Sequence, residues 1–410
     1  MQTSEAIAHA PDRMRYRGLA LLLAALAMIG PFSIDTYLPS FPAIEADLRV
    51  SAMHMQQTLS VYLLGFAVMT LFHGTLSDSF GRRPVVLANL LVFALACAGC
   101  ALAATFEQLL VFRGIQGLSA GAGIVVGRAI IRDTLQGHAA QRLMSLVTML
   151  FGIAPAVAPV IGGWLQSAFG WRPVFVFLAL YASVLLVACG ARLGESLPRG
   201  ERQPFELRAL ARNYLTVGRS FPLFLVSSAI ALNFCGFFIY IVSAPAFVYR
   251  ILGLSETQFA WIFVPAVAGV TLGAFISGRV AGKLSSRKTV KLAYAIVFGA
   301  AAFNLAYCAL AGPALPWSVL PVMGYALGMA LAMPSLTLLA LDLFPHNRGL
   351  VSSLLGFQHS LFSAILAGIV SPLLADSALE LASGMAALSV AGCACWVVYL
   401  ALQGRGLPRA

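Results

Sequence analysis

Composition and charge exclude a soluble protein. Of the 410 residues, 60% are hydrophobic and 10% are charged, whereas soluble domains are about 45–50% apolar and about 25% charged. A soluble fold of this size could not bury so much apolar surface, so lipid must surround most of the chain. The net charge of +11 raises the alternative of nucleic-acid binding. Since the basic residues lie in short stretches between apolar runs, without a continuous basic face, we reject that alternative.

Metal and cofactor chemistry finds no support in the sequence. The seven cysteines lie in apolar stretches, where a free cysteine behaves as a small hydrophobe. Cys97 and Cys100 have the spacing of a redox or metal pair, but no second pair or nearby histidine completes a site. The six histidines show no HExxH-like spacing. We therefore expect no metal, no cofactor and no enzymatic activity.

The first apolar run has the flanks of a signal peptide. Arg13, Arg15 and Arg17 precede LALLLAALAMI, as in cleaved leaders. The run continues to Leu38, however, and many similar runs follow, so we expect a retained first helix. A bilayer core of about 30 Å requires about 20 apolar residues in a helix. Twelve runs meet this requirement, at approximately residues 18–38, 54–75, 84–104, 107–127, 141–167, 171–191, 220–245, 258–280, 290–311, 316–341, 349–375 and 381–402.

The distribution of basic residues orients these twelve helices. Lysine and arginine favour cytoplasmic loops. With twelve spans, 22 of the 26 basic residues fall on the side of the two termini, and only Arg49, Arg172 and Arg250 fall on the other, while Arg113 lies within a helix. We therefore expect a multi-pass protein of the bacterial inner membrane with both termini in the cytoplasm.

The chain divides into two similar halves. The longest connection, residues 192–219, is polar and is expected to be a tether between bundles of residues 1–191 and 220–410. GTLSDSFGRRP after the second run and SGRVAGKLSSRK after the eighth begin near Gly74 and Gly278, about half the chain apart. These features predict an all-α membrane protein with two pseudo-symmetric six-helix bundles, related by an axis along the membrane normal.

The loop after the second helix is the most specific motif. It resembles the signature G-x-x-x-D-x-x-G-R-R/K between helices two and three of the major facilitator superfamily, with Gly74, Asp78, Gly81, Arg82 and Arg83 at every fixed position. Glycine permits the close approach and the tight reversal, and the arginines can pair with a neighbouring acid. An ordinary positively charged turn is the alternative.

Asp133, just after the fourth helix, is the candidate for that acid. The resemblance implies a cytoplasmic latch that holds the outward-facing state and breaks during turnover. In the second copy Gly282 stands where the aspartate is expected, so we do not expect a latch in that half.

An arginine inside the fourth helix requires a partner. Arg113, Gln116 and Gly117 in VFRGIQG are similar to the R-x-x-Q-G motif of many facilitators. Burying this arginine in a membrane costs at least about 2.5–3.5 kcal/mol, so it should face a partner or a water-filled cavity. Asp35 is the best available partner, because a rise of 1.5 Å per residue places both in the outer half of the membrane.

Asp35 lies in PFSIDTYLPSFPAI, which resembles the first helix of the Bcr/CflA drug-resistance transporters. Some related carriers have a second acid about two turns earlier, where Ala27 and Met28 stand here. We therefore expect one carboxylate in this helix. The alternative is that Asp35 only caps a helix end near Pro31.

The fifth helix is similar to the antiporter motif G-x-x-x-G-P-x-x-G-G. Ala154 and Ala158 replace its first two glycines, and small residues also serve helix packing in general. Together with the preceding motifs the segment favours antiport over uptake. The candidate residues of this motif are Pro155, Pro159, Gly162 and Gly163.

Polar residues within the apolar runs complete the candidate cavity. In the second half, Asn304 and Gln358 are weaker candidates, and an interhelical hydrogen bond is the commoner explanation for each such residue. His359, near mid-membrane, could titrate near physiological pH. The candidates for proton coupling and the substrate cavity are Asp35, Arg113, Gln116, Tyr62, Asn233, Tyr240 and His359.

These features predict a proton-driven antiporter that exports small, largely apolar drugs or antibiotics by alternating access, with protons and a small-molecule drug as its partners. We expect it to act as a monomer in the bilayer. Export of an endogenous metabolite or small peptide is an alternative, because apolar cavity walls do not name a ligand. A channel is less favoured, since paired halves without a pore-loop filter indicate a carrier.

Overall fold

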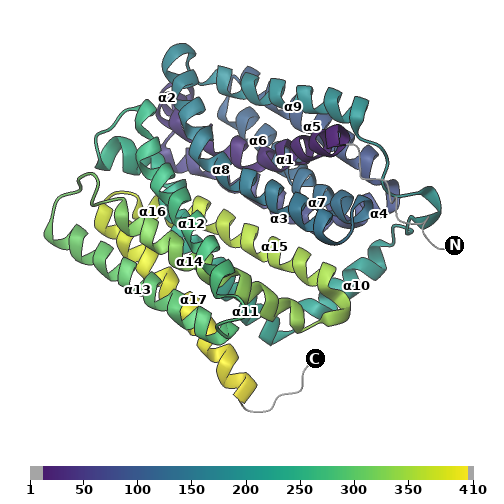
Figure 1. The fold of residues 1–410 in the computed structure, drawn as a ribbon. Helices are drawn as coiled ribbons and strands as arrows, with labels where there is room; N and C mark the ends of the chain where they lie inside the picture. Colours follow the sequence, from purple (N-terminus) through teal and green to yellow (C-terminus); the bar gives the residue numbers. More distant parts are fainter. Residues whose placement is uncertain (1–12, 405–410) are drawn as a thin grey trace.

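The computed structural model describes residues 13–404, apart from the side chains of residues 13–17 and 138. It consists of helices in two groups, one above the other in the view of Figure 1. Within this part of the chain the only sheet-like pairing is an isolated bridge between Ala281 and Leu284.

The N-terminal half contains nine helices and one short 3-10 turn in the described part of the chain. Their bounds are α1 Arg13–Asp35, η1 Leu38–Ser40, α2 Phe41–Leu48, α3 Ala52–Thr70, α4 His73–Phe80, α5 Arg82–Leu102, α6 Phe106–Ala120, α7 Ala122–Thr134, α8 Gly137–Phe169 and α9 Arg172–Arg192.

The connection to the second half is partly helical, with η2 Arg199–Glu201 and α10 Leu207–Gly218. The C-terminal half then follows. Its elements are α11 Phe221–Val242, η3 Ala246–Ile251, η4 Glu256–Gln258, α12 Ala260–Val280, α13 Ser286–Leu310, α14 Leu320–Asp342, η5 Pro345–Asn347, α15 Arg348–Ile365, η6 Leu366–Val370, α16 Ser371–Leu374 and α17 Ala378–Gly404.

Eleven helical segments in the described residues are long and apolar enough to cross a membrane, and the bent pair α3 and α4 makes up to twelve. The all-helical fold class is thereby confirmed. The second predicted span is not one straight helix, because the chain bends by 48° between α3 and α4. The fourth predicted span is likewise divided into α6 and α7, at Gly121. Neither break contains a proline, so nothing obvious in the sequence marked them.

The two halves touch mainly through two pairs of helices, α3 with α15 and α8 with α12. Three hydrogen bonds cross between the halves: Gln56 Nε2 to the Val242 carbonyl at 2.8 Å, Ser60 Oγ to the Ala364 carbonyl at 2.8 Å, and Tyr249 OH to the Pro39 carbonyl at 2.7 Å. They involve the ends of helices near α2 and α16, at the left of Figure 1, whereas the two termini lie at the right. We call these two ends the sealed side and the termini side.

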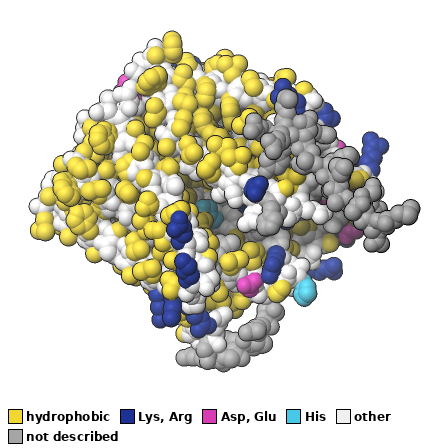
Figure 2. All heavy atoms as spheres, viewed as in Figure 1, with side chains coloured by type: hydrophobic (Ala, Val, Ile, Leu, Met, Phe, Trp, Pro, Cys, Tyr) yellow, Lys and Arg dark blue, Asp and Glu magenta, His cyan; other side chains and the backbone are white. Residues whose placement is uncertain are grey.

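The outer surface fits a lipid environment. Large apolar side chains stand exposed along the long helices, as at Leu102 (82%), Val187 (72%) and Leu310 (87%). In Figure 2 apolar side chains cover the left and upper part of the visible face, while lysine and arginine gather toward the right and the bottom, on the termini side. With eleven or twelve candidate spans, this surface makes the chain a multi-pass membrane protein.

Candidate functional site

A fully buried arginine lies at the centre of the N-terminal half. Arg113 of α6 has no exposed surface. Its Nη1 donates to the Ser33 carbonyl at 3.0 Å and to Gln116 Oε1 at 2.7 Å. The guanidinium lies 4.6 Å from the ring centroid of Tyr37 and 4.5 Å from that of Tyr62. Because aromatic faces attract cations, the two tyrosine rings stabilise a charge that lipid alone would not.

Glycines bring the helices of this site together. A side chain at Gly117 would collide with the backbone of Tyr62, and one at Gly65 would collide with the Gly114 carbonyl. Helices α3 and α6 therefore pack closely, as small residues allow in membrane proteins. This close packing places the Tyr62 ring beside Arg113, so the glycine of the R-x-x-Q-G motif positions the aromatic partner.

Asp35, the last residue of α1, is 4% exposed. Its carboxylate makes no hydrogen bond or ion pair with any residue that the structure describes. The expected direct pair with Arg113 is therefore not formed in this conformation. The reason is that Arg113 binds the carbonyl of Ser33, two residues earlier on the same helix, together with Gln116 and the two rings. A count of charges along the sequence could not anticipate these neutral partners.

The polar network around Arg113 is extensive but incomplete. Ser33 Oγ donates to Tyr62 OH at 2.5 Å, and Tyr37 OH lies 2.9 Å from Thr58 Oγ1. The amide of Gln116 donates to Cys97 Sγ at 2.9 Å. Among the described residues, Arg113 Nε and Nη2 are buried without a partner. The site thus holds free cationic donors near an unpaired acid. The sequence analysis identified Asp35, Tyr62, Arg113 and Gln116 but missed Tyr37, although it lies within the segment around Asp35.

Two candidates of the C-terminal half lie elsewhere. Asn233 Nδ2 donates to Tyr294 OH at 2.9 Å, and Asn304 Nδ2 donates to Tyr240 OH at 2.7 Å. Both pairs are buried among α11, α13, α14 and α17. The structure therefore does not bring Asn233 and Tyr240 together with Asp35.

His359 has a different environment. It is partly exposed, and its ring centroid lies 4.2 Å from that of Phe234. The neighbouring Gln358 hydrogen-bonds Ser227 and also Ser228, the latter at 2.7 Å. His359 therefore lies on a surface where α11 and α15 meet, outside the buried Asn233 and Tyr240 pairs.

The signature loop forms a compact ionic cluster on the termini side. Arg82 Nε contacts Asp133 Oδ2 at 2.9 Å, so the contact expected between an arginine of this loop and Asp133 is present. Arg82 Nη1 also pairs with Asp78 and donates to Ser77 Oγ at 2.7 Å. Arg83 Nη2 donates to the Gly190 carbonyl at 2.6 Å. The guanidinium of Arg82 thus joins α4, α5 and α7.

The long connection is more than a tether, contrary to the expectation from its polar sequence. Glu195 Oε1 accepts from the Arg82 backbone N–H at 2.9 Å, and Ser196 Oγ donates to Asp133 Oδ2 at 3.1 Å. Gly81, with φ of +100°, lies under this connection, where a side chain would collide with Glu195 and Arg202. Glycine is therefore needed there for its conformation and for its lack of a side chain. The connection and the ionic cluster form one structural unit.

Two adjacent glycines of α8 face opposite halves. A side chain at Gly162 would collide with the backbone of Thr36, and one at Gly163 with the backbone of Glu256. Gly162 thus lies against the residue after Asp35, and Gly163 lies against the first turn before α12. Ala154 and Ala158, which replace the motif's earlier glycines, are fully buried. Pro155 and Pro159 lie within the continuous helix.

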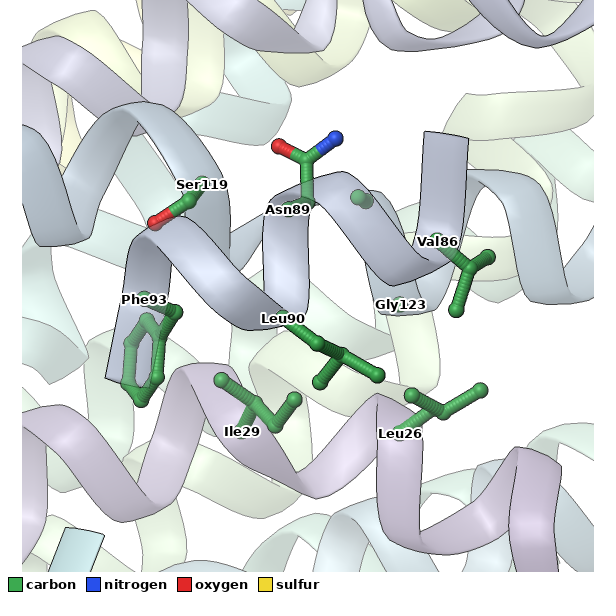
Figure 3. Close-up of a pocket in the computed structure, with 9 residues that line it drawn as sticks. Leu26, Ile29, Val86, Asn89, Leu90, Phe93, Ser119 and Gly123 are labelled. Carbon is green, nitrogen blue, oxygen red and sulfur yellow. The ribbon is translucent and has the colours of Figure 1, made fainter. Parts of the chain in front are cut away.

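The small cavities are not drug sites. Figure 3 shows one, where Leu26 and Ile29 of α1 meet side chains of α5. It has about 10 Å³ of room, which suits about one water molecule, whereas drug-sized pockets measure about 300–1,000 Å³. Asn89 and Ser119 provide polar groups there, and Asn89 also lies 3.2 Å from His73 Nε2. Within residues 13–404, no group of three or more His, Cys, Asp or Glu side chains could hold a metal ion.

The helical architecture, the ionic cluster and the buried arginine define a membrane transporter of two packed halves. Residues 21–368 match the Major Facilitator Superfamily. The chain belongs to this superfamily, and it is accordingly a transporter and not an enzyme.

Its relatives include drug-resistance proteins. The chain is 33% identical over 372 residues to the uncharacterized MFS-type transporter YdgK of Bacillus subtilis, covering 89% of this chain and 90% of the relative. It is 28% identical to a bicyclomycin resistance protein homolog of Haemophilus influenzae, over 90% and 93% of the two chains. It is 30% identical to the multidrug resistance protein MdtL of Escherichia coli, over 81% and 83%.

Solved transporters share the fold. A bacterial homolog of the lysosomal transporter Spinster superposes with a TM-score of 0.70 at 18% identity, over 95% of this chain and 97% of that one. A D-xylose–proton symporter superposes with a TM-score of 0.67 at 16% identity, over 94% and 96%.

Proposed function

We propose that the protein is a proton-driven antiporter that exports small, largely apolar drugs across the bacterial inner membrane by alternating access. The names of its relatives support drug export, and the antiporter-like glycines of α8 support exchange. The bias of basic residues supports cytoplasmic termini. With that orientation, the sealed side faces away from the cytoplasm and the structure represents an inward-facing state.

The observation that carries the proposal is the buried, unpaired carboxylate of Asp35 near Arg113. A charged carboxylate without a partner in a low-dielectric site is costly. Asp35 therefore binds a proton in this conformation. Because Arg113 is held by Ser33, Gln116 and two tyrosine rings, it does not compete with that proton.

The unpaired donors of Arg113 provide the other half of the cycle. When Asp35 releases its proton, its carboxylate becomes an acceptor for Arg113 Nε or Nη2, which have no partner among the described residues. That rearrangement changes the end of α1, because the Ser33 carbonyl shares the same guanidinium. Proton binding and drug binding then favour different arrangements of one site, which is the condition for exchange.

The membrane potential makes this exchange useful. Moving one charge across 100 mV releases about 2.3 kcal/mol, which is roughly fifty-fold accumulation per proton. One carboxylate is therefore enough to sustain a gradient of drug.

The test is drug transport by purified protein in proteoliposomes with an imposed pH gradient. Asp35→Asn should abolish transport driven by the gradient while still permitting exchange of labelled for unlabelled drug. The matched control is Asp47→Asn, because Asp47 is an exposed acid paired with Arg172 outside this site. Full gradient-driven transport by Asp35→Asn would contradict the assigned role. Ion currents without saturable exchange would instead indicate a channel.

A further inference from the structure

Helix α11 is almost entirely enclosed by the protein. After Phe224, only Leu232 and Phe234 of this helix are partly exposed. The two side chains point in nearly opposite directions, since residues two apart are about 200° apart on a helix. Phe234 lies on the side that meets His359 of α15. A partly exposed phenylalanine on an internal helix is not explained by lipid contact.

Phe234 is the centre of an aromatic panel, formed by Phe234, Phe237, Phe238 and His359. Ring centroids lie 4.2 Å apart for Phe234 and His359, 5.0 Å for Phe234 and Phe238, and 6.1 Å for Phe234 and Phe237. The Phe234 and Phe238 rings are stacked at 28°. The ring nitrogens of His359 make no hydrogen bond within the described chain. The panel therefore presents flat rings and one free hydrogen-bonding group.

The panel lies below the seal between the halves. Val242, at the end of α11, accepts the hydrogen bond from Gln56 that helps to close the sealed side. Phe234 is eight residues earlier, about 12 Å along the helix toward the termini side. In an inward-facing carrier this level is the wall of the substrate pathway. The opposite half contributes the charged site at the end of α1, while this half contributes aromatic rings.

We propose that the aromatic panel binds an aromatic ring of the exported compound by stacking, with His359 offering a hydrogen bond to a polar group beside that ring. This inference rests on the proposed function and names its substrate class: apolar compounds that carry an aromatic ring next to a hydrogen-bonding group. Stacked aromatic pairs contribute beyond simple burial. A ring should therefore bind about three- to tenfold more tightly than a saturated ring of similar size.

The experiment measures equilibrium binding to the purified full chain by calorimetry. The probes are two amphiphilic amines that differ only in a phenyl or a cyclohexyl ring, so that size and charge are matched. We expect a Kd about three- to tenfold lower for the phenyl compound. Phe234→Leu should remove that preference, and Phe234→Tyr should retain it. Size-exclusion chromatography of each variant shows whether it is folded.

Two further variants sharpen the result. His359→Phe should retain the ring preference but lose the gain from adding a hydroxyl group beside the ring. Phe303→Leu is the matched control, because Phe303 is 47% exposed on α13 away from the panel. Equal Kd values for the two amines, no binding of either, or a preference that survives Phe234→Leu would each overturn the inference. Since binding needs no gradient, loss of proton coupling in Asp35→Asn leaves this result independent of the proposed function.

Discussion

The two halves of the transporter bury different kinds of polar groups. The N-terminal half buries Asp35, Arg82 and Arg113, all of which can carry charge. The pairs at the core of the C-terminal half are neutral, as in Asn233 with Tyr294 and Asn304 with Tyr240. A duplicated architecture therefore does not imply duplicated chemistry. We infer that the first half handles the proton and that the second half provides the wall against which substrate binds.

The two copies of the signature loop show the same asymmetry. In the first, Arg82 joins Asp78 and Asp133 in one cluster. In the second, Gly282 has φ of +79° and open space around it, and Arg279 lies over the Phe275 ring at 4.8 Å. The turn is retained without its acid. Only the first copy can therefore form an ionic latch.

The largest expected effect comes from changing the charged centre. Arg113→Lys keeps the charge but cannot reproduce a planar donor that stacks between two rings. We expect gradient-driven transport to fall by about 100-fold or more, because misplacing a central group by about 1 Å can cost that much. Asn304→Ala in the other half should lower stability by about 1–3 kcal/mol but reduce transport far less. Transport assays and thermal melts of both variants make the comparison, and similar transport losses in both would contradict it.

A smaller effect is expected at the contact between the halves. Gly163→Val would push against the backbone of Glu256, whereas Gly162→Val would push against Thr36 within its own half. Only the first should hold the sealed side open. A cysteine introduced at Gln56, which is buried in the seal, should react about tenfold faster with an impermeant thiol reagent, because about 1.4 kcal/mol shifts an equilibrium tenfold. Equal labelling in the two variants would show that the glycines do not divide the roles.

The smallest expected effect is on the docked connection. Glu195→Gln weakens the bonds to the Arg82 N–H and to Arg202. These groups are partly exposed, so we expect a loss of about 1 kcal/mol, seen as a lower melting temperature. Glu201→Gln, in the same connection and without an ion pair among the described residues, is the control. A control that destabilises as much as Glu195→Gln would show that the docking is not specific.

The sequence predicted the parts of this fold that the bilayer imposes. Twelve apolar runs and the signature loop follow from length, hydropathy and fixed residue types. The breaks near His73 and Gly121 escaped because both halves of each broken helix are equally apolar. The docking of Glu195 escaped because its partner is a backbone N–H, which every residue carries.

The charged site was predicted in membership but not in geometry. Asp35 and Arg113 were identified because charges in a membrane are costly. Their separation in this conformation depends on the Ser33 carbonyl and on the rings of Tyr37 and Tyr62. Hydrophobicity patterns treat a carbonyl and an aromatic face as inert. The partner of a buried cation therefore has to be taken from the structure.

Proton release on drug binding tests the account most directly. Adding drug to purified protein in weakly buffered detergent solution should release about one proton per bound drug from the wild-type chain, and none from Asp35→Asn, because the unpaired carboxyl of Asp35 is the group that gives up the proton. Equal release from the two proteins, with equal drug binding, would contradict the account.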